Sequence, residues 1–333
     1  MKPTILDVAK LANVSKATVS RVINHNPKVD KNIRERVEQA IEQLGYRPSA
    51  IARNLANNTS NTIGLILPDI TNPYFPVLAR GIEDQAHRSG YTVIISNTDN
   101  DPRLEQEYIQ MMAQQQVGGI ILISSILEEE KMSELQSLQI PFVLCDRTIE
   151  NTTFDIVTID HYRAAFEAVE HLIRQGHQHI CHISGPVKVQ TAETRKQAYL
   201  DAMEAAGLIP VVRVGSFSYE AGYSQMLSIL NEYEPSALFA ANDLIAFGAI
   251  NALQSKGMKV PDDVAVIGCD DITFAGMYKP ALSTISVPAY QIGATSVELL
   301  ESRMKGVRND AKQVVLEHSF SWRETCIGGK QTR

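Results

Sequence analysis

The stretch Asp7-Val-Ala-Lys-Leu-Ala-Asn-Val-Ser-Lys-Ala-Thr-Val-Ser-Arg-Val-Ile-Asn24 has the pattern of two short helices joined by a tight turn. Apolar residues recur at helical spacing on both sides of the turn, where Asn13 can adopt a left-handed conformation. Thr4 and Asp7 have the spacing of a capping box, and Ser15 is placed to cap the second helix. That helix would expose short polar and long cationic side chains, which suits insertion into the major groove of DNA.

The residues that follow extend this hairpin to a small all-α headpiece and a linker. A third helix is predicted between an N-cap at Asp30 and an end at Gly45, because one face is apolar: Ile33, Val37, Ala40, Ile41 and Leu44. Residues 50–56 would form only two helical turns, which are too short to be stable alone in water. A run rich in Asn, Thr and Ser follows. Residues 48–61 are therefore predicted to be a linker whose helix folds only when a partner supplies contacts.

Basic residues are concentrated at the start of the chain. The formal charge is −7 overall, but residues 1–60 hold ten Lys and Arg against five Asp and Glu, and the remainder holds 21 against 33. This distribution indicates that DNA is contacted at one end only. A signal-peptide segment and a membrane-spanning apolar run are both missing, so we expect a cytoplasmic protein without membrane contacts. Four cysteines lack disulfide or metal spacing and are expected to be reduced: Cys145, Cys181, Cys269 and Cys326.

From residue 62 onward, near-continuous apolar runs, typical of strands buried on both faces, alternate with helical stretches of ~15 residues. The runs cover residues 63–69, 92–96, 119–124, 142–146, 179–184, 237–241 and 264–268. This alternation predicts two α/β lobes over residues 62–329, each a parallel sheet covered by helices. Ligands in such folds bind at the carboxyl ends of strands, and here also between the lobes. The predicted organisation is a headpiece (1–47), a linker (48–61) and a two-lobed domain (62–329).

The chain resembles the lactose-repressor (LacI) family of bacterial transcription regulators along essentially its whole length. The motifs that carry the resemblance are Asp7-Val-Ala, Val14-Ser, Thr18-Val-Ser-Arg21-Val, Gly45-Tyr-Arg-Pro48 and Ala52-Arg-Asn-Leu55. The body resembles periplasmic sugar-binding proteins. The resemblance implies a homodimeric transcriptional repressor that binds near-palindromic operator DNA and is released by a small, pentose-like sugar, without a cofactor or metal.

The same resemblance places the second helix in the major groove. Arg21 is suited to a guanine contact because its planar fork can donate two hydrogen bonds, and Ala17 could meet a thymine methyl group. Residues 50–56 resemble a hinge helix that forms on operator DNA, in which Leu55 would wedge into a base step from the minor groove. An ordinary apolar contact of Leu55 with the body is the alternative. The predicted DNA-binding residues are Ser15, Lys16, Ala17, Thr18, Ser20, Arg21, Asn24, Ala52 and Leu55.

The predicted sensor resembles ribose-type repressors and ribose-binding proteins, and the resemblance places its ligand residues at the ends of buried strands. Amide, carboxylate and guanidinium groups would bind sugar hydroxyls, and aromatic rings would face the apolar side of the sugar. The predicted ligand-binding residues are Asn72, Tyr74, Phe75, Asp146, Arg147, Arg195, Phe217, Asn242 and Asp270. Asp243 and Asp271 have two possible roles: they could bind the ligand, or they could stabilise helix caps and loop turns.

One segment departs from the pattern of the sugar-binding relatives, many of which carry a ligand-binding glutamine soon after the motif that here is Thr284-Ile285. Val287 stands in this segment and cannot make that bond, and Gln291 is displaced toward a helix. The departure implies a sugar other than ribose, or ribose held by different contacts.

Three other functions compete with the sugar-responsive repressor. A catabolite-control-type regulator would take a phosphorylated partner protein as effector. A sugar-binding transport protein is opposed by the basic headpiece. An enzyme is opposed by the lack of an activated nucleophile or a phosphate-binding loop. A metal site is not expected either, because the histidines clustered in sequence do not converge on one position: His171, His177, His179 and His182.

Overall fold

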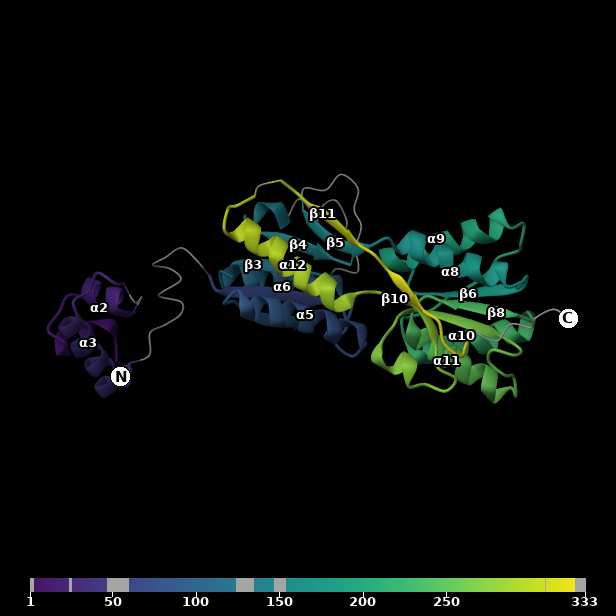
Figure 1. Ribbon diagram of the computed structural model, residues 1–333, viewed down its shortest axis with the longest axis horizontal. Helices are drawn as coiled ribbons and strands as arrows, with labels where there is room; N and C mark the ends of the chain where they lie inside the picture. Colours follow the sequence, from purple (N-terminus) through teal and green to yellow (C-terminus); the bar gives the residue numbers. More distant parts are fainter. Residues whose placement is uncertain are drawn as a thin grey trace. The chain divides into compact units, whose positions relative to one another are not determined.

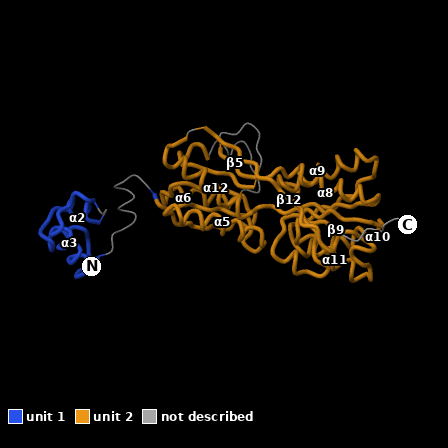
Figure 2. Tube along the Cα trace, viewed as in Figure 1, with its two compact units in different colours: residues 1–60 blue, residues 61–333 orange. Residues whose placement is uncertain are grey.

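The computed structural model describes residues 3–23, 26–46, 60–123, 135–146, 154–308 and 310–326. The chain divides into two compact units, residues 1–60 and 61–333, which are coloured separately in Figure 2. Among the described residues, no helix is both long enough and apolar enough to cross a membrane.

The first unit contains the predicted helix-turn-helix, formed by α1 (Ile5–Leu11) and α2 (Lys16–Ile23). The capping box is confirmed, since the Thr4 side chain accepts from the Asp7 N–H and Asp7 accepts from the Thr4 N–H at 2.8 Å. Asn13 adopts the left-handed conformation with φ +52°. The Ser15 hydroxyl accepts from the Thr18 N–H at 3.1 Å, which satisfies one of the free amides at the start of α2.

The third helix, α3 (Lys31–Leu44), has the predicted bounds, with Asp30 as N-cap and a left-handed Gly45 at its end. It closes a small core shared by all three helices. The buried apolar residues of this core are Val8, Ala9, Ala12, Val19, Val22, Val37 and Ala40. The apolar face predicted for α3 is therefore the face that packs against the helix-turn-helix.

The second unit contains two six-stranded sheets, each covered by helices, which we call the first and second lobe (Figure 1). The first sheet has the order β11-β5-β4-β3-β1-β2, all parallel. Its strands are β1 (Thr62–Leu67), β2 (Thr92–Asn97), β3 (Gly119–Leu122), β4 (Phe142–Cys145), β5 (Asp155–Ile159) and β11 (Gln313–Leu316). The second sheet has the order β12-β10-β9-β8-β6-β7. Its strands are β6 (Ile180–Ser184), β7 (Val211–Val214), β8 (Ala237–Ala240), β9 (Ala265–Asp270), β10 (Ser283–Ser286) and β12 (Ser319–Ser321).

Helices pack in close pairs around the sheets. The first lobe carries α5 (Tyr74–Arg88), α6 (Pro102–Gln114) and α12 (Ala289–Met304). The second carries α8 (His161–Arg174), α9 (Gln190–Ala205), α10 (Tyr219–Glu232) and α11 (Asp243–Ser255), followed by a short 3₁₀ turn (Thr273–Gly276). The backbones of α5 and α12 approach closely because Gly81 and Gly293 face the partner helix, where a Cβ atom would collide with backbone carbonyls.

The prediction of two α/β lobes is confirmed, but two details of the sheets were wrong. The second sheet is not wholly parallel, because β12 pairs antiparallel with β10. The run at residues 92–96 is not buried on both faces, because β2 lies at a sheet edge and Ile95 is 48% exposed. The sequence pattern also did not reveal that the lobes are discontinuous. The chain passes between them after β5, after β10 and again between β11 and β12.

All four cysteines are free and buried, three of them in central strands. Burial raises the pKa of the Cys181 thiol to about 12 and that of Cys326 to about 11. These thiols are therefore protonated core groups at neutral pH.

Candidate functional sites

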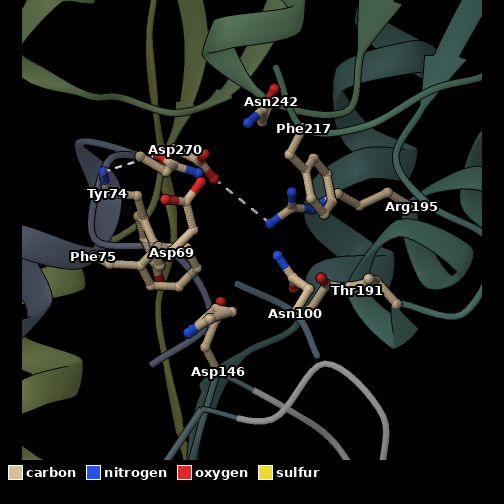
Figure 3. A pocket seen from close by; sticks show the side chains of 13 residues that line it. Asp69, Tyr74, Phe75, Asn100, Asp146, Thr191, Arg195, Phe217, Asn242 and Asp270 are labelled. Atoms are coloured by element: carbon tan, nitrogen blue, oxygen red, sulfur yellow. Dashed lines mark hydrogen bonds and ion pairs between the residues drawn. The ribbon is translucent and has the colours of Figure 1, made fainter. Parts of the chain in front are cut away.

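A cavity lies between the two lobes, at the carboxyl ends of their strands (Figure 3). Its empty volume is about 500 Å³, part of which is open to solvent. The first lobe contributes Pro68, Asp69, Asn72, Tyr74, Phe75, Asn100 and Asp146. The second lobe contributes Val189, Thr191, Arg195, Phe217, Asn242 and Asp270. This position is the one expected for a ligand in an open α/β fold.

Eight of the nine predicted ligand residues line this single cavity: Asn72, Tyr74, Phe75, Asp146, Arg195, Phe217, Asn242 and Asp270. The ninth, Arg147, lies outside the described residues. Figure 3 shows Asp69, Tyr74 and Phe75 reaching in from one side, and Arg195 and Phe217 from the other. The residues predicted at separate strand ends thus converge in space, and their role in ligand binding is taken up under the proposed function.

Arg195, on α9, is the buried cation of the cavity. Its Nη1 donates to the Ala241 carbonyl at 2.6 Å, and its Nη2 lies 3.7 Å from Asp270 Oδ1. Within the described part of the chain, its Nε has no acceptor. Burial lowers the pKa of Arg195, but the negative charges that Cys269, Asp270 and Asp146 can carry raise it more, so its pKa stands above the ordinary value. Arg195 is thus a permanent charge with one donor still available.

Asp270 ends β9 in an uncommon backbone conformation, with φ +120°. Burial raises the pKa of its carboxyl to about 7; the charge of Arg195 opposes this rise and that of Asp146 adds to it. The carboxyl therefore exchanges its proton near neutral pH, which makes it either a hydrogen-bond donor or a pure acceptor.

The aromatic residues of the cavity differ in what they expose. The Tyr74 ring is buried and meets Phe75 edge-on, with ring centroids 5.3 Å apart. Its hydroxyl has no partner among the described residues. Burial raises the pKa of Tyr74 well above its usual value, and the charges of Asp146 and Asp270 raise it further. The hydroxyl therefore stays protonated and can donate. Phe217 packs against Gly185, where any side chain would collide with its ring.

The two asparagines of the cavity fix the local backbone as well as facing the cavity. Asn72 Oδ1 accepts from the Tyr74 N–H at 3.1 Å. Asn242 is the N-cap of α11, and its Oδ1 accepts from the Ile245 N–H at 2.9 Å. The amide nitrogen of Asn242 is buried without an acceptor in the described part of the chain. Its side chain is thus oriented by the helix start, with its donor side uncommitted.

The cavity also contains residues that the sequence analysis missed. Asp69, Asn100 and Thr191 line it, together with Pro68 and Val189. Asp69 is the last residue of the first run, 63–69, and carries the same signal as Asp146 and Asp270. Asn100 has a positive φ of 59° in a loop, and no sequence pattern marked it.

His161 is a further missed residue and lies behind the cavity wall, at the start of α8. Its Nε2 is 2.9 Å from Asp146 Oδ1, and its Nδ1 is 3.3 Å from Arg195 Nη2. The sequence did contain a signal for His161. Asp160 and His161 are a polar pair that directly follows the apolar run Ile156-Val-Thr-Ile159, which forms the end of β5. It was overlooked because β5 was not predicted.

Neither Asp243 nor Asp271 lines the cavity. Asp243 accepts from the Thr284 hydroxyl at 2.6 Å and from the Ile272 N–H at 2.8 Å. Asp271 accepts from the Ser321 hydroxyl and from Arg323 Nη2, both at 2.7 Å. These hydrogen bonds join α11 to β10 and connect the residues just after β9 with α11, β12 and Arg323. Both aspartates therefore have structural contacts rather than a place in the cavity lining.

The segment that departs from the sugar-binding pattern also lies apart from the cavity lining. Val287 is buried in the core, and Gln291 is an exposed residue in the first turn of α12. Neither of them is among the cavity residues of the described chain.

In the headpiece, α2 presents one face to solvent. Ser15, Lys16, Ala17 and Arg21 are exposed, whereas Thr18 and Ser20 are half-buried. The hydroxyls of Ser15 and Thr18 lie 2.9 Å apart and hydrogen-bond each other. The opposite face, with Val19 and Val22, is buried in the core. The remaining DNA-binding candidates, Asn24, Ala52 and Leu55, lie outside the described residues, as does the segment 50–56.

The four clustered histidines have separate environments. His171 stacks on Trp322, His177 hydrogen-bonds Ser236, and His179 packs near Tyr233. His182 is fully buried, which lowers its pKa to about 4, and its Nδ1 donates to the Phe239 carbonyl at 2.8 Å. The described residues contain no group of three or more potential metal ligands.

Two sequence families match the chain. Bacterial regulatory proteins of the lacI family match residues 4–49, and the periplasmic binding proteins and sugar binding domain of the LacI family match residues 60–321. These two ranges contain the helix-turn-helix and the two lobes that form the cavity.

Relatives of known role are similar over nearly their full length. Catabolite control protein A from Priestia megaterium is 39% identical, covering 98% of this chain and 99% of the relative. The ribose operon repressor from Halalkalibacterium halodurans is 38% identical, covering 99% and 98%. The crystal structure of the lac repressor dimer bound to operator and the anti-inducer ONPF matches with a TM-score of 0.88 at 28% identity, covering 98% of this chain and 99% of that one. The chain therefore belongs to the LacI family of bacterial regulatory proteins and is a DNA-binding transcriptional repressor with a sugar-binding domain.

Proposed function

We propose that this repressor controls a sugar-utilisation operon and that an uncharged, pentose-like sugar, ribose first, binds between its lobes and releases it from the operator. The observation that carries this proposal is a set of three buried donors without partners among the described residues, Tyr74 Oη, Arg195 Nε and Asn242 Nδ2, all on residues that line one cavity. A buried donor without an acceptor costs about 1–3 kcal/mol, and hydroxyl oxygens of a ligand would remove that cost.

The charges of the cavity favour a neutral sugar over a sugar phosphate. The described lining holds three carboxyl groups, on Asp69, Asp146 and Asp270, against one cation, Arg195. A carboxylate accepts hydrogen bonds from hydroxyl groups but repels a phosphate. Tyr74, Phe75 and Phe217 supply the apolar faces against which the C–H side of a sugar ring packs. Similarity to a ribose operon repressor supports ribose as the first candidate.

On the DNA side, we infer that α2 of each subunit of a homodimer enters the major groove of one half of a near-palindromic operator. The exposed Lys16, Ala17 and Arg21 would face the base edges, while Ser15, Thr18, Ser20 and Asn24 would contact or position the backbone. The hinge segment 50–56, with Ala52 and Leu55, would add contacts in the minor groove. Because operator DNA is the target, the working compartment would be the cytoplasm.

Effector and operator would be coupled through closure of the lobes. A sugar held by both lobes favours their closed arrangement, and this arrangement would disfavour pairing of the hinge segments on DNA. By linkage, operator DNA must then weaken sugar binding by the same factor.

Isothermal titration calorimetry with D-ribose, D-xylose and ribose 5-phosphate tests the effector, and operator retardation with and without the sugar tests the response. We expect ribose to bind and to release the operator, and ribose 5-phosphate to bind at least tenfold more weakly. Arg195→Gln should abolish the heat signal. Arg174→Gln removes a matched arginine that pairs with Glu170 on the outer face of α8, and it should leave the signal unchanged. Silence of the wild-type protein with every pentose would refute the sugar proposal.

A second candidate is a catabolite-control-type regulator whose effector is a phosphorylated partner protein. The 39% identity to catabolite control protein A supports it. The two candidates differ in what purified protein does alone. A sugar-released repressor binds its operator tightly without any addition, whereas a regulator that needs a phosphorylated partner binds weakly until that partner is present.

A further inference from the structure

We propose that His161 is a positioning residue of the effector site, which as a neutral imidazole joins Asp146 of the first lobe to Arg195 of the second. The inference rests on the proposed function in one respect, namely that Asp146 and Arg195 contact the sugar. His161 itself is not part of the cavity lining. It lies where the chain passes from β5 in the first lobe to α8 in the second, directly after the N-cap Asp160.

The geometry determines which nitrogen of His161 carries the hydrogen. Arg195 Nη2, 3.3 Å from Nδ1, can only donate, so Nδ1 must accept. The hydrogen therefore sits on Nε2 and is donated to Asp146 Oδ1 at 2.9 Å. An imidazolium would turn an Nδ1–H bond toward the N–H bonds of a guanidinium, two like charges in contact. The neutral Nε2–H form is the only one that serves both neighbours.

This arrangement connects two charges that do not touch. Arg195 is held on three sides, by the Ala241 carbonyl, by Asp270 and by His161, which fixes the plane of its guanidinium. Asp146 is held at a left-handed backbone position, φ +57°, with its N–H donating to the Val157 carbonyl. His161 links them at a site where its own side chain is 3% exposed and that of Asp146 is 7% exposed. At this depth, water does not readily replace the imidazole.

The consequence is that a residue of the second lobe orients a ligand-facing group of the first. Asp146 directly follows β4 and Arg195 lies on α9, so neither sheet alone fixes both. An open and a closed arrangement of the lobes would differ in the distance that His161 spans. The imidazole therefore favours the arrangement in which the Asp146 carboxylate and the Arg195 guanidinium already face the cavity. This reduces the entropy that is lost when a ligand binds.

The first test needs no sugar. With ¹⁵N-labelled histidine in the full-length protein at pH 8, the His161 signals are assigned by their loss in His161→Phe. We expect Nε2 to be protonated and Nδ1 to be an unprotonated acceptor. The opposite tautomer, or an imidazolium, would overturn the proposal whatever the effector is. Circular dichroism checks that His161→Phe is folded, and if it is not, His161→Gln provides the assignment.

The second test separates the two links of His161 by calorimetry with D-ribose. His161→Gln can still reach Asp146, His161→Asn can still accept from Arg195, and His161→Phe makes neither bond. We expect ribose affinity to fall about ten- to a hundredfold in His161→Phe, and less in the two amide variants, since a buried hydrogen bond to a charged group is lost. His171→Gln is the control on the same helix and should bind like wild type.

A double-mutant cycle with Asp146→Asn distinguishes positioning from general support of the fold. If His161 acts through Asp146, the loss in the double variant is smaller than the product of the single losses. Independent losses would show that His161 does not act through Asp146. If wild type binds ribose and His161→Phe binds equally well, the positioning role fails and the sugar proposal stands. If wild type binds no pentose, the sugar proposal fails and the tautomer measurement still decides the geometry of His161.

Discussion

Arg195 and Asp270 form an ion pair in which Nη2 and Oδ1 lie 3.7 Å apart and both side chains are less than a tenth exposed. The distance is long for a salt bridge, so the guanidinium only partly offsets the cost of burying the carboxylate. A ligand that adds or removes hydrogen bonds at this pair should therefore change the protonation of Asp270.

The stability of the protein should depend on pH through Asp270. Burial raises the pKa of Asp270 from 3.8 to about 7, against the opposing effect of Arg195. Because the native state then holds this proton more tightly than the unfolded chain, this contribution to the free energy of unfolding falls as pH rises from about 4 to about 7. Asp270→Asn removes the titration. The difference in unfolding free energy, variant minus wild type, should rise across this window by at most about 4 kcal/mol, at about 1.36 kcal/mol per pKa unit.

Urea unfolding of both proteins at pH 4, 5.5, 7 and 8 measures this difference. The part of the difference that does not change with pH reflects the loss of the Arg195 partner. A difference that stays constant over the whole pH range would contradict the raised pKa of Asp270.

Tyr74→Phe should stabilise the protein and weaken sugar binding. Removing a buried hydroxyl that has no partner among the described residues should raise the unfolding free energy by about 1 kcal/mol. The same change should lower ribose affinity roughly tenfold, because a donor to the sugar is lost. Tyr199→Phe is the matched control: its hydroxyl donates to the Ile180 carbonyl at 2.9 Å and accepts from the Val211 N–H at 2.8 Å. That variant should lose stability and keep its ribose affinity, and a Tyr74 variant that behaved in the same way would exclude a ligand role for the hydroxyl.

Arg21→Ala should relax base preference rather than abolish DNA binding. Each bidentate contact to guanine discriminates by about 1–3 kcal/mol, so operators altered at one base pair should bind nearly as well as the original. Lys31→Ala, on the exposed start of α3, should leave the preference unchanged. Fluorescence anisotropy with a panel of single-base operator variants measures both. A uniform loss of affinity across the panel would assign Arg21 to a phosphate instead.

Trp322 should report closure of the lobes. It is the single tryptophan of the chain, and its ring stacks on His171 and Phe320 with centroids 4.0 and 4.8 Å apart. It directly follows β12, just beyond one of the passages between the lobes. Ribose should change its emission with the same dissociation constant as calorimetry gives, and Arg195→Gln should remove the change. Unaltered emission at saturating ribose would show that this passage does not move.

The cavity residues could be predicted because their signal is local. A polar residue directly after a strongly apolar strand is visible in sequence, and Asp146, Asn242 and Asp270 all have it. His161 was missed for a non-local reason. The strand before it begins with Asp155, a fully buried carboxylate whose charge is balanced by Arg303 and Arg308, which accompany it only in the folded chain. The antiparallel pairing of β12 is equally non-local, because three residues carry too little pattern to reveal a strand direction.

The placement of β11 and β12 has a consequence for synthesis on the ribosome. These strands are consecutive in sequence, yet each is the edge strand of a different sheet. A nascent chain that still lacks residues 313–321 has two incomplete sheets and no finished lobe, whereas every contact of the headpiece core is already present within its first 46 residues. The DNA-reading part can therefore fold early and alone. The two sheets of the sensing part can be completed only after residues 313–321 have been synthesised, so a product truncated before them would carry the whole headpiece core and two incomplete sheets.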